Sequence, residues 1–232
     1  MRKGPPKVTS GGIGADEWDV AKDAWKDHAE GTAEAIAGLE DAVERGGAAA
    51  AERSERVAVI ARAIAVRLGL AEAVIEKIVI ASRLHDVGMT AVPEAILSKL
   101  GPLTSVEMAE VKRHPELGEQ LVAEAGLPEI GRWIRHHHER WDGNGYPDRL
   151  SGPEIPIESR ILAISDALAA MTAERPYRSA MGAEMACLEI KASAGTQFDP
   201  GIARIVIALL ERDAFADDAN ADPGLVTPAI DV

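Results

Sequence analysis

The fold of this chain is decided between residues 57 and 86, which read VAVIARAIAVRLGLAEAVIEKIVIASRLHD. The first half predicts an α-helix, because its apolar side chains recur at steps of three and four residues and so share one face. These side chains are Val57, Ile60, Ala61, Ile64 and Leu68. Gly69 then stands where a helix C-terminus favours glycine. Residues 71–86 predict the next helix, and His85 lies on its apolar face, so this imidazole is expected to point toward the core.

The same helical spacing recurs along the chain, and strand-like alternation of useful length is absent. Further helices are predicted at 16–45, from the capping box Thr104–Glu107, and at 128–138, 157–172, 183–193 and 200–212. We therefore expect an all-α fold, a single helical bundle with an extra N-terminal helix. The predicted organisation is a flexible arm at 1–15, the N-terminal helix at 16–46, the folded domain at 47–212 and a disordered acidic tail at 213–232.

The composition is typical of a soluble globular protein. The chain has 232 residues, of which 47% are hydrophobic and 27% charged, and its formal net charge is −13. Such acidity argues against binding to long nucleic acids or anionic membranes. It does not exclude a small anionic substrate, because most of the net charge lies in residues 1–52 and 201–232.

Cysteine content and hydropathy indicate the compartment. Cys187 is the only cysteine in the sequence, so an internal disulfide is excluded and a reducing compartment is favoured. We expect its side chain to be a small buried apolar group. No apolar run has the length of a signal peptide or membrane span, and a cytoplasmic location is therefore predicted.

The histidines are concentrated rather than spread evenly. Five of the six lie between residues 85 and 138, close to carboxylates. Imidazole and carboxylate without cysteine suit Fe, Mn or Zn in a catalytic site. Six candidate ligands exceed the three that a single catalytic zinc typically takes, so two ions sharing a carboxylate are predicted. The candidates are His85, Asp86, His114, His137, His138 and Asp166.

Several motifs surround these residues in a fixed order. They are His85-Asp86-Val87-Gly88, His114-Pro115-Glu116-Leu117-Gly118, His137-His138-Glu139-Arg140-Trp141-Asp142-Gly143-Asn144-Gly145-Tyr146-Pro147, Arg160-Ile161-Leu162, Asp166, Arg175-Pro176-Tyr177-Arg178 and Gly195-Thr196-Gln197-Phe198-Asp199-Pro200. In this order the sequence resembles the HD-GYP branch of the HD superfamily of metal-dependent phosphohydrolases, over about residues 50–210.

The resemblance implies a phosphodiesterase that hydrolyses cyclic di-GMP to pGpG or GMP with a metal-bridging hydroxide at a dinuclear site. It implies two divalent ions, Fe or Mn, held by the six candidates above, with Asp86 as the bridge. The catalytic residues would be His85, Asp86 and Asp166, and His136 has no counterpart among the ligands. Substrate would contact Arg175, Arg178, Tyr146 and Gly145, although a purely structural turn explains Gly145 equally well.

Four positions depart from the family pattern. Arg53 stands where many members have a metal-binding histidine, and Ala49 stands where some have a glutamate linked to a third metal, which argues against a trinuclear site. Met89 replaces a lysine near the substrate phosphate. Ala169 replaces an aspartate that would support ligand orientation.

Two functional classes therefore stay open. The first is the dinuclear phosphodiesterase, acting on cyclic di-GMP or on a different phosphate ester. The second is a catalytically degenerate domain that binds cyclic di-GMP or a signalling partner.

The N-terminal helix either mediates a homodimer or packs on the bundle. Asp199 is interpreted structurally, as a cap for the helix that Pro200 begins.

Overall fold

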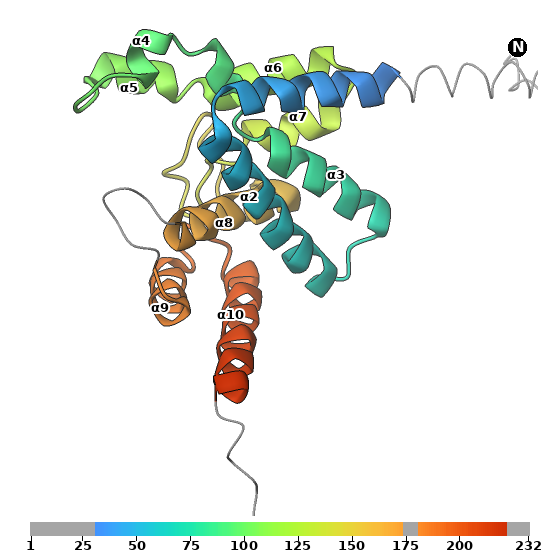
Figure 1. Cartoon of the computed structure of the whole chain (residues 1–232), viewed down its shortest axis with the longest axis vertical. Helices are drawn as coiled ribbons and strands as arrows, with labels where there is room; N and C mark the ends of the chain where they lie inside the picture. Colours follow the sequence, from blue (N-terminus) through green and yellow to red (C-terminus); the bar gives the residue numbers. More distant parts are fainter. Residues whose placement is uncertain (1–30, 174–180, 222–232) are drawn as a thin grey trace, which may run out of the picture.

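A computed structural model describes residues 31–173 and 181–221, with the backbone alone from 212 onward. The predicted arm at 1–15, the first half of the N-terminal helix and the end of the tail lie outside these residues. Arg175 and Arg178 also lie outside them. Figure 1 shows an assembly of helices, and the described residues contain no strand beyond an isolated bridge between Ala194 and Phe198. The predicted all-α fold is confirmed.

The first helices carry the hydrophobic pattern of the deciding segment. Residues 31–45 are helical and lead into α2 (Ala48–Arg67), which is followed by α3 (Glu72–Leu84). Gly69 separates α2 from α3 with a positive φ of 72°, a backbone conformation that glycine adopts without strain. His85 directly follows α3 and is 1% exposed, as its place on the apolar face predicts.

Short elements bring the chain from α3 to the other histidines. They are η1 (Val87–Ala91), α4 (Glu94–Leu97), α5 (Ser105–Val111), α6 (His114–Glu124) and α7 (Pro128–Arg135). The predicted capping box is confirmed, since Thr104 and Glu107 each accept the other's backbone N–H. Helix α7 ends at Arg135, whereas the sequence analysis predicted a helix that continues to His138. The chain turns at His136, and the N–H of His137 donates to the Ile134 carbonyl over a tighter turn.

The C-terminal part begins with η2 (Gly152–Glu154) and continues through α8 (Ile157–Thr172), α9 (Ala183–Ser193) and α10 (Pro200–Ala221). Helix α10 extends past Arg212, where the sequence analysis ended it and began a disordered tail. Asp199 caps this helix as predicted: its Oδ1 accepts the N–H of Gly201 at 2.6 Å and of Ile202 at 3.3 Å. Its other oxygen pairs with Arg160 at 2.6 Å.

The core is mainly aliphatic and is built by α2, α3, α7 and α8, with further side chains from α9 and α10. Helix α2 packs against α3 and α8, α6 packs against α7 and η1, and α9 packs against α10 (Figure 1). The largest fully buried apolar side chains are Ile64, Ile78, Leu84, Ile130, Ile134, Ile155, Ile161, Leu162, Ile164 and Ile190. This packing brings the ends of α3 and α7 to the middle of α8, where the candidate ligands meet.

Two expectations from composition can be compared with the structure. Cys187 is only partly buried, on α9 beside a surface groove, because α9 has a single well-covered face; the expectation of a buried thiol was wrong. Within the described segments, none of the helices combines the length and the apolar character that a bilayer crossing would need.

Candidate metal centre

Three histidines are held by the same backbone contact. The Nδ1 atoms of His85, His114 and His137 each lie within hydrogen-bond distance of the carbonyl oxygen three residues earlier, at 2.7, 2.9 and 2.6 Å respectively. A carbonyl only accepts, so Nδ1 carries the proton and donates it. In the neutral ring the lone pair then sits on Nε2, the arrangement that commonly orients a metal-binding histidine.

The Nε2 atoms of these rings are buried and make no hydrogen bond within the described residues. Buried polar atoms are rarely left in this state, because an unmade hydrogen bond costs about 1–3 kcal/mol. Three such atoms at one place fit a site built to hold an electrophile. The donor set of imidazoles and carboxylates, without cysteine, suits a divalent metal ion.

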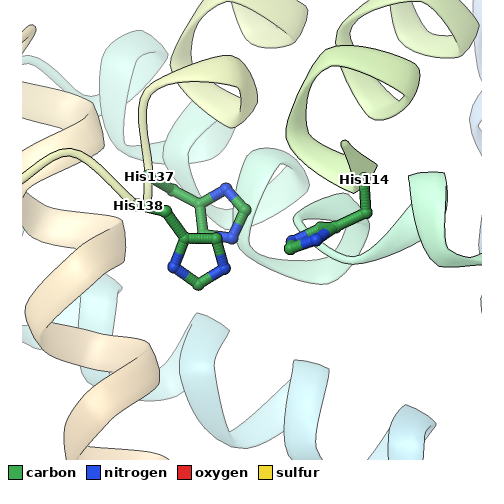
Figure 2. Close-up of side chains that lie close together, drawn as sticks. All are labelled: His114, His137 and His138. Carbon is green, nitrogen blue, oxygen red and sulfur yellow. The ribbon is translucent and has the colours of Figure 1, made fainter. Parts of the chain in front are cut away.

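His114, His137 and His138 form the most compact group. One ring nitrogen from each lies within 4.8 Å of the others. Figure 2 shows His137 and His138 coming from the turn after α7 and His114 from the start of α6, with the rings facing one another. Burial lowers the pKa of His138 to about 4 and that of His137 well below its usual value, so both are neutral and able to act as ligands.

The carboxylates join this group to His85. Asp86 lies between two imidazoles, with Oδ1 3.4 Å from Nε2 of His114 and Oδ2 3.2 Å from Nε2 of His85. Oδ1 of Asp166 lies 3.5 Å from the same Nε2 of His85. Although burial opposes a charged imidazole, Asp86 and Asp166 raise the pKa of His85 to about 10. The structure thus brings the six expected ligands together, and ligation itself stays a prediction.

Arg53 is the unexpected member of the cluster. Its Nε and Nη2 both donate to Oδ1 of Asp166, at 3.0 and 2.6 Å. The two residues come from α2 and α8, which pack side by side. The sequence analysis noted Arg53 as a missing histidine, but the pairing of Arg53 with Asp166 could not be foreseen from it.

A close backbone approach places Asp86 beside His114. A Cβ atom built on Gly88 would collide with the backbone carbonyl of His114 and the backbone N of Gly118. Only glycine lets η1 lie this close to the first turn of α6. The Gly of the His-Asp-x-Gly motif therefore has a packing role, and it sets the distance between Asp86 and His114.

The loop after the histidines closes one side of the centre. The Tyr146 ring stacks on His138 with centroids 4.9 Å apart. Gly145 is buried against the backbone of Glu139 and Arg140, where a side chain would not fit. This packing supports the turn interpretation of Gly145. The loop is fixed by Glu139, whose Oε1 accepts the N–H of Asp148 at 2.7 Å.

Lys112 and His136 complete the surroundings. The Lys112 ammonium lies 5.2 Å from the Tyr146 ring centroid, which places a positive charge beside the centre that the sequence analysis missed. Its position two residues before His114 was the only available signal.

Nε2 of His136 lies 2.9 Å from Oδ2 of Asp148, which also pairs with Arg135, so this nitrogen is engaged in an ion-pair network and not with the six candidate ligands.

The comparison with known families agrees with this geometry. The model of the HD domain matches residues 38–202. The chain therefore belongs to the HD domain family, and the resemblance to its HD-GYP branch is confirmed.

Named relatives make the placement more specific. Over 181 residues the chain is 39% identical to the cyclic di-GMP phosphodiesterase response regulator RpfG of Xanthomonas campestris, covering 74% of this chain and 47% of that protein. Over 177 residues it is 37% identical to 3′3′-cGAMP-specific phosphodiesterase 2 of Vibrio cholerae, covering 75% of this chain and 34% of that protein. The chain thus spans less than half the length of these two relatives.

A solved structure supports the fold. The cyclic GMP-AMP specific phosphodiesterase V-cGAP3 of V. cholerae superimposes with a TM-score of 0.55 at 20% identity, over 79% of this chain and 49% of that chain. At this identity the likeness shows the helical fold alone.

Proposed function

We propose that this chain is a metal-dependent phosphodiesterase that hydrolyses cyclic di-GMP to pGpG or GMP. The observation that carries the proposal is the set of buried Nε2 atoms on His85, His114 and His137, which make no hydrogen bond within the described residues and lie beside two carboxylates. Membership of the HD domain family supports it, and so do the names of the relatives. These names give the competing hypothesis of a non-hydrolysing domain no support.

The six candidate ligands would hold two divalent ions, with Fe or Mn as the expected metals and Asp86 as the shared carboxylate. Bound ions of this kind lower the pKa of water and neutralise negative charge on a phosphodiester. Burial keeps His137 and His138 neutral, and the backbone contacts at Nδ1 fix the rings of His114 and His137. Catalytic roles for His85, Asp86 and Asp166 follow from their place at the centre.

Substrate recognition would rest on side chains around the centre. Tyr146 offers an aromatic face next to His138, and Arg175 and Arg178 would contact phosphate oxygens through their guanidinium groups. Lys112 adds an ammonium beside the Tyr146 ring.

We also propose a cytoplasmic location, without long nucleic acid or membrane as a partner. We propose two further partners, a second copy of the chain bound through the N-terminal helix and a signalling protein. Size measurements on chains with and without residues 1–46 test for both.

Hydrolysis of cyclic di-GMP by the Mn²⁺-loaded full chain, followed by chromatography of pGpG and GMP, tests the proposed activity. We expect His137→Ala to abolish product release, because it removes one of the three clustered nitrogens. His136→Gln is the matched control, since glutamine can still donate to Asp148 and this position is not among the candidate ligands. Equal turnover by His137→Ala would reject the proposed centre.

The substrate is tested separately, because relatives carry two different names. Parallel reactions with cyclic di-GMP and 3′3′-cGAMP give the ratio of kcat/KM values, and we expect cyclic di-GMP to be preferred. A strong preference for 3′3′-cGAMP would keep the reaction class and overturn the substrate.

A further inference from the structure

The two halves of the metal centre differ in one respect, the presence of a competing cation. On one side, Oδ1 of Asp166 receives two hydrogen bonds from Arg53 and also lies 3.5 Å from Nε2 of His85. On the other side, His114, His137 and His138 converge with no ion pair from a lysine or arginine among the described residues.

Both hydrogen bonds from Arg53 go to the same atom. A carboxylate oxygen that accepts two guanidinium hydrogens has little capacity left for a metal ion. The guanidinium also stays charged at every accessible pH, so it repels a divalent ion approaching Asp166 from the His85 side. The ion pair is shielded from water on its acidic side, where the Asp166 side chain is 13% exposed.

Arg53 is nevertheless able to leave. Its side chain is 36% exposed, and it lines a cavity of about 420 Å³ together with Glu52, Arg56 and Thr172. Moving the guanidinium into this cavity would not disturb the aliphatic core. Arg53 can therefore compete reversibly with a metal ion for Asp166.

We propose that the centre binds two metal ions with unequal affinity, because Arg53 competes with the second ion for Asp166. The first ion takes His114, His137 and His138 with Asp86. The second ion needs His85 and Asp166, and it binds only when Arg53 is displaced. Arg53 is thus a positioning residue that sets metal occupancy, and this inference rests on the metal centre of the proposed function.

A metal titration without substrate tests the inference. The metal-stripped full chain is titrated with Mn²⁺ by calorimetry, and electron paramagnetic resonance detects magnetic coupling between paired ions. We expect one tight and one weak binding step in the unaltered chain. In Arg53→Ala and Arg53→His the affinity of the second step should rise about tenfold or more. The second ion then no longer has to break the charge-assisted contact between Arg53 and Asp166.

Three further variants make the result specific. Arg56→Ala is the matched control, because Arg56 lines the same cavity but bonds to Glu52 and to the Thr172 carbonyl, and its titration should be unchanged. Asp166→Asn should remove the second step and keep the first. Arg53→Gln, which keeps hydrogen bonding without charge, provides the same measurement if Arg53→Ala does not fold.

Two equal tight steps in the unaltered chain would overturn the inference. An unchanged second step in folded Arg53→Ala and Arg53→Gln would overturn it as well. Neither outcome depends on cyclic di-GMP, so failure here is distinguishable from failure of the proposed phosphodiesterase activity.

Discussion

At the scale of single residues, the centre depends on which atom of each imidazole is free. Backbone carbonyls of Ser82, Val111 and Ile134 accept hydrogen bonds from the Nδ1–H groups, and this leaves Nε2 directed at the carboxylates and at the other rings. These contacts come from residues only three positions away in sequence. The orientation of each ring is therefore decided locally, at the end or start of a helix, before the helices pack.

Lys112 gives a prediction at this scale. Lys112→Ala should raise KM for cyclic di-GMP by about fivefold with little change in kcat, the range expected for an exposed charge near an anion. Because such charges are screened, the difference should shrink at high salt. Arg113→Ala is the control: this neighbouring arginine is exposed and pairs with Glu110. Equal KM values for both variants would show that Lys112 does not contact substrate.

His138 gives a prediction about pH for the metal-free protein. Its pKa is lowered to about 4 by burial and by His114, whereas an unfolded histidine titrates near 6.5. Between these values the unfolded chain binds more protons, so the free energy of unfolding should fall as the pH drops from 6.5 toward 4. His138→Gln should reduce this slope in urea titrations at several pH values. An unchanged slope would show that His138 is not buried as a neutral ring.

At the scale of elements, close packing of η1 on α6 brings Asp86 to His114. Gly88→Ala should destabilise the fold by about 2–4 kcal/mol, because the added methyl collides with backbone atoms that cannot move away. Gly38→Ala is the matched control in an exposed helical position with nothing within 4 Å, and it should be neutral or stabilising. Urea unfolding measures both, and similar stabilities would contradict the packing role of Gly88.

Asp199 is predicted to matter for stability and not for the chemistry. Asp199→Ala removes both the cap of α10 and the pair with Arg160, and should cost about 1–2 kcal/mol. Asp199→Asn keeps an accepting oxygen for the cap and should lose less. Thermal unfolding distinguishes the two variants, and a loss of turnover at temperatures where Asp199→Asn is folded would contradict this interpretation.

The elements also show what the sequence can predict. Helices at Ile157–Thr172 and Ala183–Ser193 were predicted with their correct ends, because apolar spacing and flanking residues are local signals. The early end of α7 was missed, since His136, His137 and His138 carry no local signal that stops a helix. The contact between Arg53 and Asp166 was missed because 113 residues separate them and only packing of α2 on α8 joins them.

At the scale of the whole molecule, the helical bundle brings residues from α2, α6, α8 and the segments after α3 and α7 to one buried point. The acidity of the chain lies mainly in its flanks, so the formal net charge of −13 does not describe the surroundings of the centre. An anionic substrate would meet Lys112 and the bound metal locally. The family assignment and the geometry therefore both support the proposed metal-dependent hydrolysis.

Turnover as a function of bound metal tests this central claim most directly. The metal-stripped full chain is titrated with Mn²⁺ while release of pGpG and GMP from cyclic di-GMP is followed. We predict no product without metal and a rate that rises with Mn²⁺ bound at the histidine cluster. Undiminished hydrolysis by the stripped chain, or no hydrolysis with every candidate ion bound, would contradict the account.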